Sequence, residues 1–285
     1  SGHTRAACQP RGDLVKMTDR RLHPDPKRIT EKTAAQITLP VVDLNRSPDG
    51  PRDRQALYGE ALTVLHRTDG TAYVQLTKDN YCGYISETAI GPAVPPTHVV
   101  TAPATHAYTR ADLKSPDVSS LSFGSRVEVT GTEGRFAQTS LGHIPTQHLA
   151  PLPHAFPDPA AVAEMFLGTP YLWGGNSRWG IDCSGLVQAA FLACGIPCPG
   201  DSDQQQTSFA EPVAGAGPVP RDIQRNDLLF WKGHVALVLD PATMIHANAH
   251  HMAVTREPIQ DALTRIAKTD GPLTGHKRLS PSKWP

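Results

Sequence analysis

The chain has no net charge: its 285 residues include 27 Lys and Arg and 27 Asp and Glu. This balance argues against a nucleic-acid binder, which carries a basic surface, and against a polybasic membrane anchor. Long hydrophobic runs are also missing, since the longest are about ten residues or fewer and a membrane-spanning helix needs roughly 20. We therefore expect neither nucleic acid nor membrane among the partners, and the sequence leaves the oligomeric state unknown.

Cysteine is scarce and odd in number. The five cysteines show no paired spacing, so we expect no disulfide framework. No Cys/His cluster has the spacing of zinc ligands, so we predict no metal site.

The N-terminus lacks an apolar signal core. We expect residues 1–34 to form a segment that is partly helical or extended. Residues 1–16 read poorly as a natural start. Met17 could be the initiating residue, or a signal peptide could precede the sequence, and both alternatives stay open.

One run stands out against this background, from Tyr171 to Val187. Its first half is rich in Gly and polar residues, and its second half begins an apolar helical pattern that continues to Cys194 and stops at Gly195. Cys183 lies where the loop becomes the helix. Unpaired backbone N–H groups and the positive end of the helix dipole favour a thiolate there, although most cysteines are merely small buried hydrophobes.

Two downstream segments offer a base for this thiol. Residues 234–240 read as a buried strand that begins with His234, and residues 244–248 read as a second strand that contains His246. A turn at 240–243 would join them as a hairpin and bring the two histidines together. A Cys–His pair oriented by a third polar group is the general form of thiol-peptidase catalysis.

Residues 35–152 are of a different kind, with short β-rich runs broken by Gly, Pro and Asp. A faint internal repeat relates residues 57–85 to residues 121–145. Pro-rich stretches at 91–96 and 151–159 predict boundaries, because such linkers are stiff and extended.

Residues 155–285 resemble the NlpC/P60 domain, a papain-like cysteine peptidase fold that cleaves bacterial cell-wall peptides. The resemblance rests on six blocks in the order of that family: Tyr171-x-Trp173-Gly174-Gly175, Asp182 to Val187, Pro199 to Gln205, Asn226 to Phe230, Gly233 to Ala236 and Ile245 to Ala247. The usual block before the second strand has Gly where this chain has Asn226, which tolerates the same left-handed backbone.

The repeat at 35–152 resembles tandem bacterial SH3-like barrels. The expected fold class is therefore α+β, a papain-like NlpC/P60 catalytic domain preceded by two small SH3-like β-barrels. The expected boundaries are 35–94 for the first barrel, 97–152 for the second and 155–285 for the peptidase.

The resemblance also assigns roles. It implies Cys183 as nucleophile, His234 as base and then acid, His246 as the residue that orients His234, and Tyr171 near the oxyanion site. Glu60 and Tyr81 of the first barrel, with Asp182, Ser184, Asp201 and Ser202 of the peptidase, match substrate-contacting positions. Read without the resemblance, Glu60 would be a strand-end glutamate and Tyr81 a barrel-packing tyrosine.

A free substrate α-amine buried beside carboxylates and a phenol would explain a preference for short peptides, because an N-blocked peptide would leave those carboxylates unpaired. The predicted function is hydrolysis of the γ-D-glutamyl–diamino acid bond in cell-wall peptides with a free N-terminal L-Ala, in peptidoglycan recycling, with no cofactor. The missing signal core favours a cytoplasmic location. An amidase or acyltransferase on the same scaffold, or a non-catalytic wall-binding protein, stays open.

Overall fold

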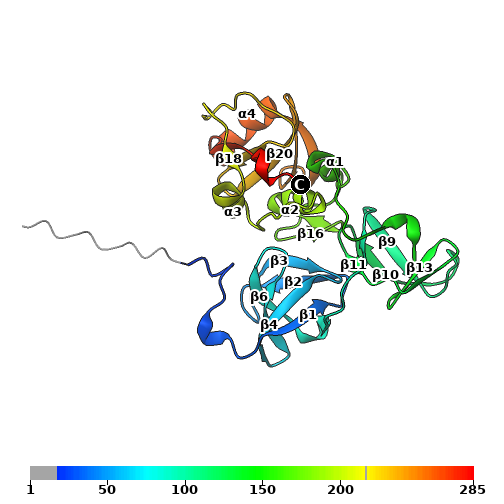
Figure 1. The fold of residues 1–285 in the computed structure, drawn as a ribbon. Helices are drawn as coiled ribbons and strands as arrows, with labels where there is room; N and C mark the ends of the chain where they lie inside the picture. The colour runs from blue at the N-terminus through cyan, green and yellow to red at the C-terminus, as the bar shows by residue number, and fades with distance from the viewer. Residues whose placement is uncertain (1–17, 216) are drawn as a thin grey trace, which may run out of the picture.

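The computed structural model describes residues 18–215 and 217–285, which form two β-rich parts and one mixed part (Figure 1). The N-terminal segment holds one short 3-10 helix, η1 (Pro26–Arg28). The predictions for residues 1–16 and for Met17 lie outside the described residues.

The first β-rich part is a seven-stranded antiparallel sheet in the order β3-β2-β6-β5-β4-β1-β7. Apolar side chains at alternate positions, such as Leu62 and Val64, point into one core because successive strand residues face opposite sides. Asp69 and Gly70 turn β4 into β5 with φ of 49° and 78°, the left-handed conformation that tight hairpins need. The elements are β1 (Thr33–Ile37), β2 (Val41–Asn45), β3 (Arg52–Leu57), β4 (Ala61–Thr68), β5 (Thr71–Leu76), β6 (Cys82–Ser86), η2 (Glu87–Ala89) and β7 (Ile90–Pro92).

The second β-rich part combines a five-stranded and a three-stranded sheet, in the orders β10-β9-β14-β13-β12 and β11-β8-β15. Gly134, with φ of 58°, lies in the turn between β12 and β13. It corresponds to Gly70 between β4 and β5 of the first barrel, as the sequence repeat predicts. The elements are β8 (His98–Val100), β9 (Ala104–Tyr108), β10 (Asp117–Ser122), β11 (Arg126–Val127), β12 (Gly131–Glu133), β13 (Phe136–Thr139), β14 (Gly142–Pro145), η3 (Thr146–His148) and β15 (Leu149–Pro151).

The C-terminal part is built on a six-stranded sheet in the order β18-β23-β19-β20-β21-β22. It carries α1 (Pro159–Glu164), β16 (Asn176–Ser177), β17 (Gly180–Ile181), α2 (Cys183–Ala193), α3 (Ser202–Gln204), η4 (Gln205–Phe209), β18 (Glu211–Pro212), β19 (Leu228–Trp231), β20 (His234–Asp240), β21 (Thr243–Asn248), β22 (Ala253–Pro258), α4 (Ile259–Thr269), β23 (Gly275–Arg278) and η5 (Pro281–Lys283).

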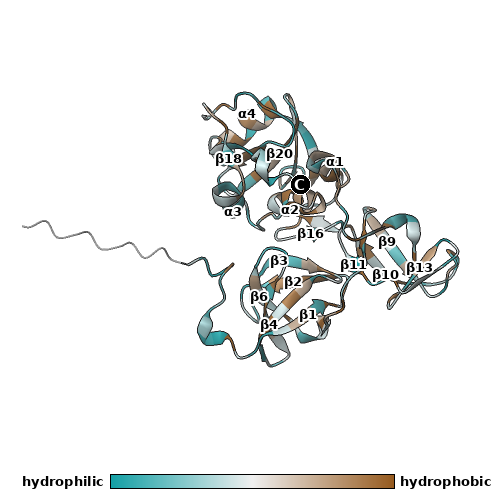
Figure 2. Ribbon diagram, in the orientation of Figure 1, coloured by the Kyte–Doolittle hydropathy of each residue, from teal (hydrophilic) through white to brown (hydrophobic). Residues whose placement is uncertain are grey.

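Helices cover both faces of this sheet. Val235 and Leu237 pack with α1 and α2 in one core, whereas Ala236 and Val238 pack with α4 in another. The interior of β20, residues 235–239, is therefore apolar and buried on both faces, and β20 and β21 form the predicted hairpin. Figure 2 shows hydrophobic colour along α2 and the inner strands of the first barrel. No helix in the described part of the chain combines the length and the apolar character needed to cross a bilayer.

Candidate active site

Cys183 is the first residue of α2, where the sequence pattern places the change from loop to helix. Asp182 is the N-cap, and its carboxylate accepts a hydrogen bond of 2.7 Å from the backbone N–H of Gly185. The same carboxylate accepts a second bond of 2.9 Å from the N–H of Gly174, which holds the preceding loop against the helix. The loop-to-helix junction that presents the thiol is thus fixed from both sides.

The thiol is buried, with only 7% of Cys183 exposed. Burial raises its pKa to about 12, and the neighbouring Asp182 carboxylate adds to the rise. The backbone N–H groups of Val235 and Ser184 act in the opposite direction but do not offset it. Withdrawal from water therefore opposes the effect of the helix N-terminus, which by itself favours a thiolate.

The two predicted histidines lie together. His234 Nε2 is 2.8 Å from His246 Nδ1. His234 is the first residue of β20, and His246 lies within the neighbouring strand β21. Burial, with His246 as a further cause, lowers the pKa of His234 to about 3. The contact of Val235 with the thiol places the start of β20 against the start of α2. Burial thus favours the neutral form of both the Cys183 thiol and the His234 imidazole.

Glu257 on β22 continues this chain of contacts, and Arg265 on α4 holds it. His246 Nε2 lies 2.8 Å from Glu257 Oε2, and Arg265 donates to both carboxylate oxygens at 3.0 and 2.8 Å. Burial pushes the pKa of Glu257 upward, but the hydrogen bonds from His246 and Arg265 prevail and lower it to about 2. Glu257 is therefore ionised at neutral pH and can only accept hydrogen bonds.

This carboxylate fixes the proton positions of both rings. His246 must carry its proton on Nε2 to donate to Glu257, so its Nδ1 is an acceptor. His234 then donates from Nε2, which leaves a lone pair on its Nδ1. His234 is thereby held in the tautomer of a general base. The sequence offered no local signal for Glu257 or Arg265, because neither belongs to a recognisable motif.

Tyr171 lines the same pocket as Cys183. Burial raises the pKa of its phenol, and the neighbouring Cys183 and Asp182 contribute further. Tyr171 therefore remains a neutral hydroxyl that can donate a hydrogen bond beside the thiol.

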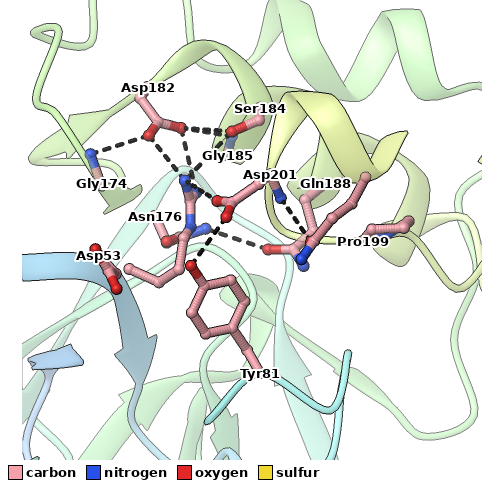
Figure 3. Close-up of polar contacts among 12 residues, drawn as sticks. Asp53, Tyr81, Gly174, Asn176, Asp182, Ser184, Gly185, Gln188, Pro199 and Asp201 are labelled. Carbon is pink, nitrogen blue, oxygen red and sulfur yellow. Dashed lines mark hydrogen bonds and ion pairs between the residues drawn. The ribbon is translucent and has the colours of Figure 1, made fainter. Parts of the chain in front are cut away.

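The pocket in front of Cys183 has a volume of about 740 Å³ and is walled by the first barrel as well as the peptidase part. The barrel supplies Asp53, Arg54 and Tyr81, and the other side supplies residues that the sequence predicted: Asp182, Ser184, Asp201 and Ser202. Figure 3 shows Tyr81 pointing toward Asp201, with Asp182 and Ser184 above it. The hydroxyl of Tyr81 donates to Asp201 Oδ2 at 2.9 Å.

Arg54 is the buried cation of this wall and was not predicted. It donates to both oxygens of Asp182, at 2.8 and 3.2 Å, and to the hydroxyl of Ser184 at 3.3 Å. Asp201 Oδ1 lies 3.6 Å away. Burial raises the pKa of Asp201, although Arg54 and Tyr81 counteract this. The barrel is thus ion-paired directly to the cap of the nucleophile helix.

Glu60 is the predicted site residue that the structure places elsewhere. Its carboxylate accepts from Lys78 at 2.9 Å and lines a separate cavity of about 440 Å³ between the first barrel, α2 and the start of the second barrel. The assignment of Glu60 to the substrate pocket is therefore corrected. Asp53, seven residues earlier on β3, is the barrel carboxylate that lines the pocket, because β3 runs along the peptidase part whereas Glu60 follows its end.

Comparison with known proteins agrees with this architecture. The model described as "NlpC/P60 family" matches residues 168–267, and the model described as "Bacterial dipeptidyl-peptidase Sh3 domain" matches residues 44–90. A solved NlpC/P60 family protein from Bacillus cereus superposes with a TM-score of 0.70 at 21% identity, covering 87% of this chain and 100% of that one, which shows a shared fold.

Curated proteins similar in sequence include two dipeptidyl-peptidases. One is a gamma-D-glutamyl-L-lysine dipeptidyl-peptidase of Bacillus cereus, 31% identical over 163 residues, or 53% of this chain and 45% of the relative. The other is dipeptidyl-peptidase 6 of Lysinibacillus sphaericus, 34% identical over 125 residues, or 41% of this chain and 44% of the relative. The matched regions span less than half the length of each relative.

Proposed function

Because the chain carries an NlpC/P60 domain behind a bacterial SH3 domain, we propose that it is a cysteine peptidase that hydrolyses the γ-D-glutamyl–diamino acid bond of cell-wall peptides with a free N-terminal L-Ala. The observation that carries this proposal is the hydrogen-bonded series His234–His246–Glu257 behind a cysteine at the head of α2. Both curated relatives are named as dipeptidyl-peptidases, one of them for a gamma-D-glutamyl-L-lysine bond, and these names support the proposal.

Catalysis begins from a neutral pair. The sulfur of Cys183 attacks the scissile carbonyl while its proton passes to Nδ1 of His234, which the tautomer leaves unprotonated. The positive charge that forms is spread over His246 toward the ionised Glu257. The backbone N–H of Cys183 and the hydroxyl of Tyr171 donate to the oxyanion. His234 then protonates the leaving amine, and water hydrolyses the thioester.

The pocket suits a peptide that begins with a free amine. A buried ammonium needs carboxylate or phenol acceptors, and Asp201, Tyr81 and Asp53 lie together in the pocket wall. The α-carboxylate of D-Glu would lie nearer Ser184 and Ser202, with Arg54 as a neighbouring cation. A preference for free amines restricts the enzyme to fragments already released from the wall, and we propose a role in peptidoglycan recycling in the cytoplasm.

A defined substrate panel tests the proposal: free L-Ala-γ-D-Glu-diaminopimelate, the same tripeptide acetylated at its amine, and intact sacculi. We expect cleavage of the free tripeptide and a loss of kcat/KM of about 100-fold or more on acetylation, because an amide cannot pair with the buried carboxylates. Equal turnover of the free and acetylated peptides would contradict the free-amine assignment. Release of stem peptides from sacculi, with no tripeptide cleavage, would instead indicate an amidase.

A further inference from the structure

The segment before the first barrel runs along that barrel and reaches the peptidase part. We call residues 19–31 the N-terminal strap. The backbone carbonyl of Arg21 accepts from the N–H of Cys82 at 2.6 Å, and that of Leu22 accepts from the side chain of Gln75 at 3.2 Å. Further along the strap, Arg28 donates to the hydroxyl of Tyr84 on β6. These contacts fix the strap on β5 and β6, and Arg20, Arg21 and Arg28 of the strap line the pocket in front of Cys183. Figure 1 shows the course of this segment, in blue, before the first barrel.

Arg21 points from the strap into that pocket and binds three carboxylates. Its Nη1 donates to Asp201 at 2.7 Å and to Asp203 at 3.0 Å. Its Nη2 donates to Asp203 at 2.7 Å and to Asp19 at 2.9 Å, and its Nε donates to Asp19 at 3.0 Å. One guanidinium therefore joins the strap to the start of α3.

The oxygen of Asp201 that receives Arg21 is the one that receives the hydroxyl of Tyr81. Under the proposed function these two residues bind the substrate ammonium. Asp201 is thus already paired with a cation of the chain itself. Two positive groups on one carboxylate oxygen repel each other, so the ammonium and Arg21 compete for it.

We propose that Arg21 is a specificity-determining residue, an internal counter-ion of Asp201 that the substrate ammonium must replace. This inference rests on the proposed function. An N-acylated or anionic peptide end cannot form the ion pair with Asp201, so Arg21 stays bound to Asp201 and blocks that peptide end. A free amine can replace Arg21, because it carries the same positive charge.

The surroundings of Arg21 allow its guanidinium to move away from Asp201. Asp19 and Asp203 keep the guanidinium paired after it leaves Asp201, so no charge is stranded. The side chain of Asp203 is 62% exposed, which gives the displaced group access to water. The exchange therefore replaces one ion pair at Asp201 with another.

Steady-state kinetics on the free tripeptide test this inference with the variant Arg21→Gln. We expect KM to fall about three- to tenfold, because Arg21 no longer competes with the substrate ammonium for Asp201 during binding. We expect kcat to stay nearly unchanged, because the bond-breaking step does not involve Arg21. The matched control is Lys27→Gln, which removes one positive charge from an exposed residue of the same strap that does not line the pocket. Its KM should equal that of the unaltered protein.

A second variant gives a change of opposite sign. Asp203→Asn removes one of the carboxylates that pair with the guanidinium after it leaves Asp201. Arg21 should therefore bind Asp201 more tightly, and KM should rise. In the double variant Arg21→Gln/Asp203→Asn this rise should disappear. An unchanged or higher KM in Arg21→Gln, with active unaltered protein, would overturn the inference and leave the proposed function standing. Failure of the unaltered protein to cleave the tripeptide would overturn both.

Discussion

The reactivity of Cys183 depends on two opposing local effects. A helix N-terminus stabilises a negative charge by up to about 2 kcal/mol in favourable geometry. Burial and the adjacent Asp182 act against it and raise the thiol pKa to about 12. Under the proposed function, the thiolate therefore forms during attack, by transfer of the thiol proton to His234.

Alkylation by iodoacetamide tests this at the residue itself. The thiol pKa is raised, so the thiolate fraction is small at pH 7. As long as the pH stays below that pKa, the fraction increases about tenfold for each unit by which the pH rises. We expect the labelling rate of Cys183, followed by mass spectrometry of its peptide, to rise in that way between pH 7 and 9. Fast labelling that does not change with pH in this range would show a resting thiolate–imidazolium pair instead.

Glu257 carries the second residue-scale prediction. A glutamine in its place can donate as well as accept, so the tautomers of His246 and His234 would no longer be fixed. We expect Glu257→Gln to lower kcat by at least about tenfold with little change in KM, since a wrong tautomer removes the base. Arg265→Gln is the control: it keeps the ionised carboxylate and should cost much less. Equal effects of both variants would reduce Glu257 to a packing role.

At the scale of elements, sequence reasoning succeeded where the signal is local. The helix at 183–193 begins at a capping aspartate, and the hairpin of β20 and β21 consists of two apolar runs around a turn. Asn226 adopts φ of 71°, as expected for a residue that stands in for glycine. Each of these features depends on neighbours within a few residues.

The next residue, Asp227, ties β19 to β23 and gives a stability prediction. Its buried carboxylate accepts from His276 at 2.7 Å and from Arg278 at 2.6 and 2.8 Å. Asp227→Asn removes the negative charge that faces Arg278 and weakens the acceptor of the His276 hydrogen bond, so we expect a loss of about 1.5–3 kcal/mol in the free energy of unfolding, measured in urea. Asp222, which also contacts Arg278 but has a side chain that is 68% exposed, is the control. Asp222→Asn should cost less than about 1 kcal/mol.

The pH dependence of this difference has a definite sign. Burial acts to raise the pKa of Asp227, but Arg278 and His276 prevail and lower it below its ordinary value. A carboxylate with a depressed folded-state pKa stabilises the protein above its unfolded pKa of about 4 and loses that contribution as the pH falls further. The gap between the unaltered protein and Asp227→Asn should therefore shrink below pH 4. A gap that widens on acidification would contradict this assignment.

At the scale of the whole molecule, the pocket in front of Cys183 is shared between parts that are distant in sequence. The fold class was predicted correctly, because family motifs and β-rich repeats are visible along the chain. The wall residues Asp53, Arg54 and Arg21 were missed, and Glu60 was assigned in place of Asp53. Which side chain of β3 faces the peptidase part depends on how two parts with separate cores pack together, and no periodicity within either part encodes that contact.

Gly174 tests whether this docking matters for activity. It has φ of 72°, and a Cβ there would lie 2.7 Å from the backbone oxygen of Asp53 on the barrel. Gly174→Ala should push β3 away from the pocket and lower kcat/KM on the tripeptide about 10- to 100-fold, because a small displacement misplaces the substrate. Gly168→Ala is the control, with φ of 80° but nothing within 4 Å. It shares the backbone strain and should change stability more than activity.

The most direct measurement is the mass spectrum of products formed from L-Ala-γ-D-Glu-diaminopimelate by the unaltered protein, Cys183→Ala and Cys194→Ala. Cys194 is buried at the end of α2 and takes no part in the proposed chemistry. We predict L-Ala-D-Glu and free diaminopimelate from the unaltered protein and Cys194→Ala, and intact tripeptide with Cys183→Ala. The same products from Cys183→Ala, or cleavage at another bond, would contradict the assignment of Cys183 as the nucleophile of a γ-D-glutamyl peptidase.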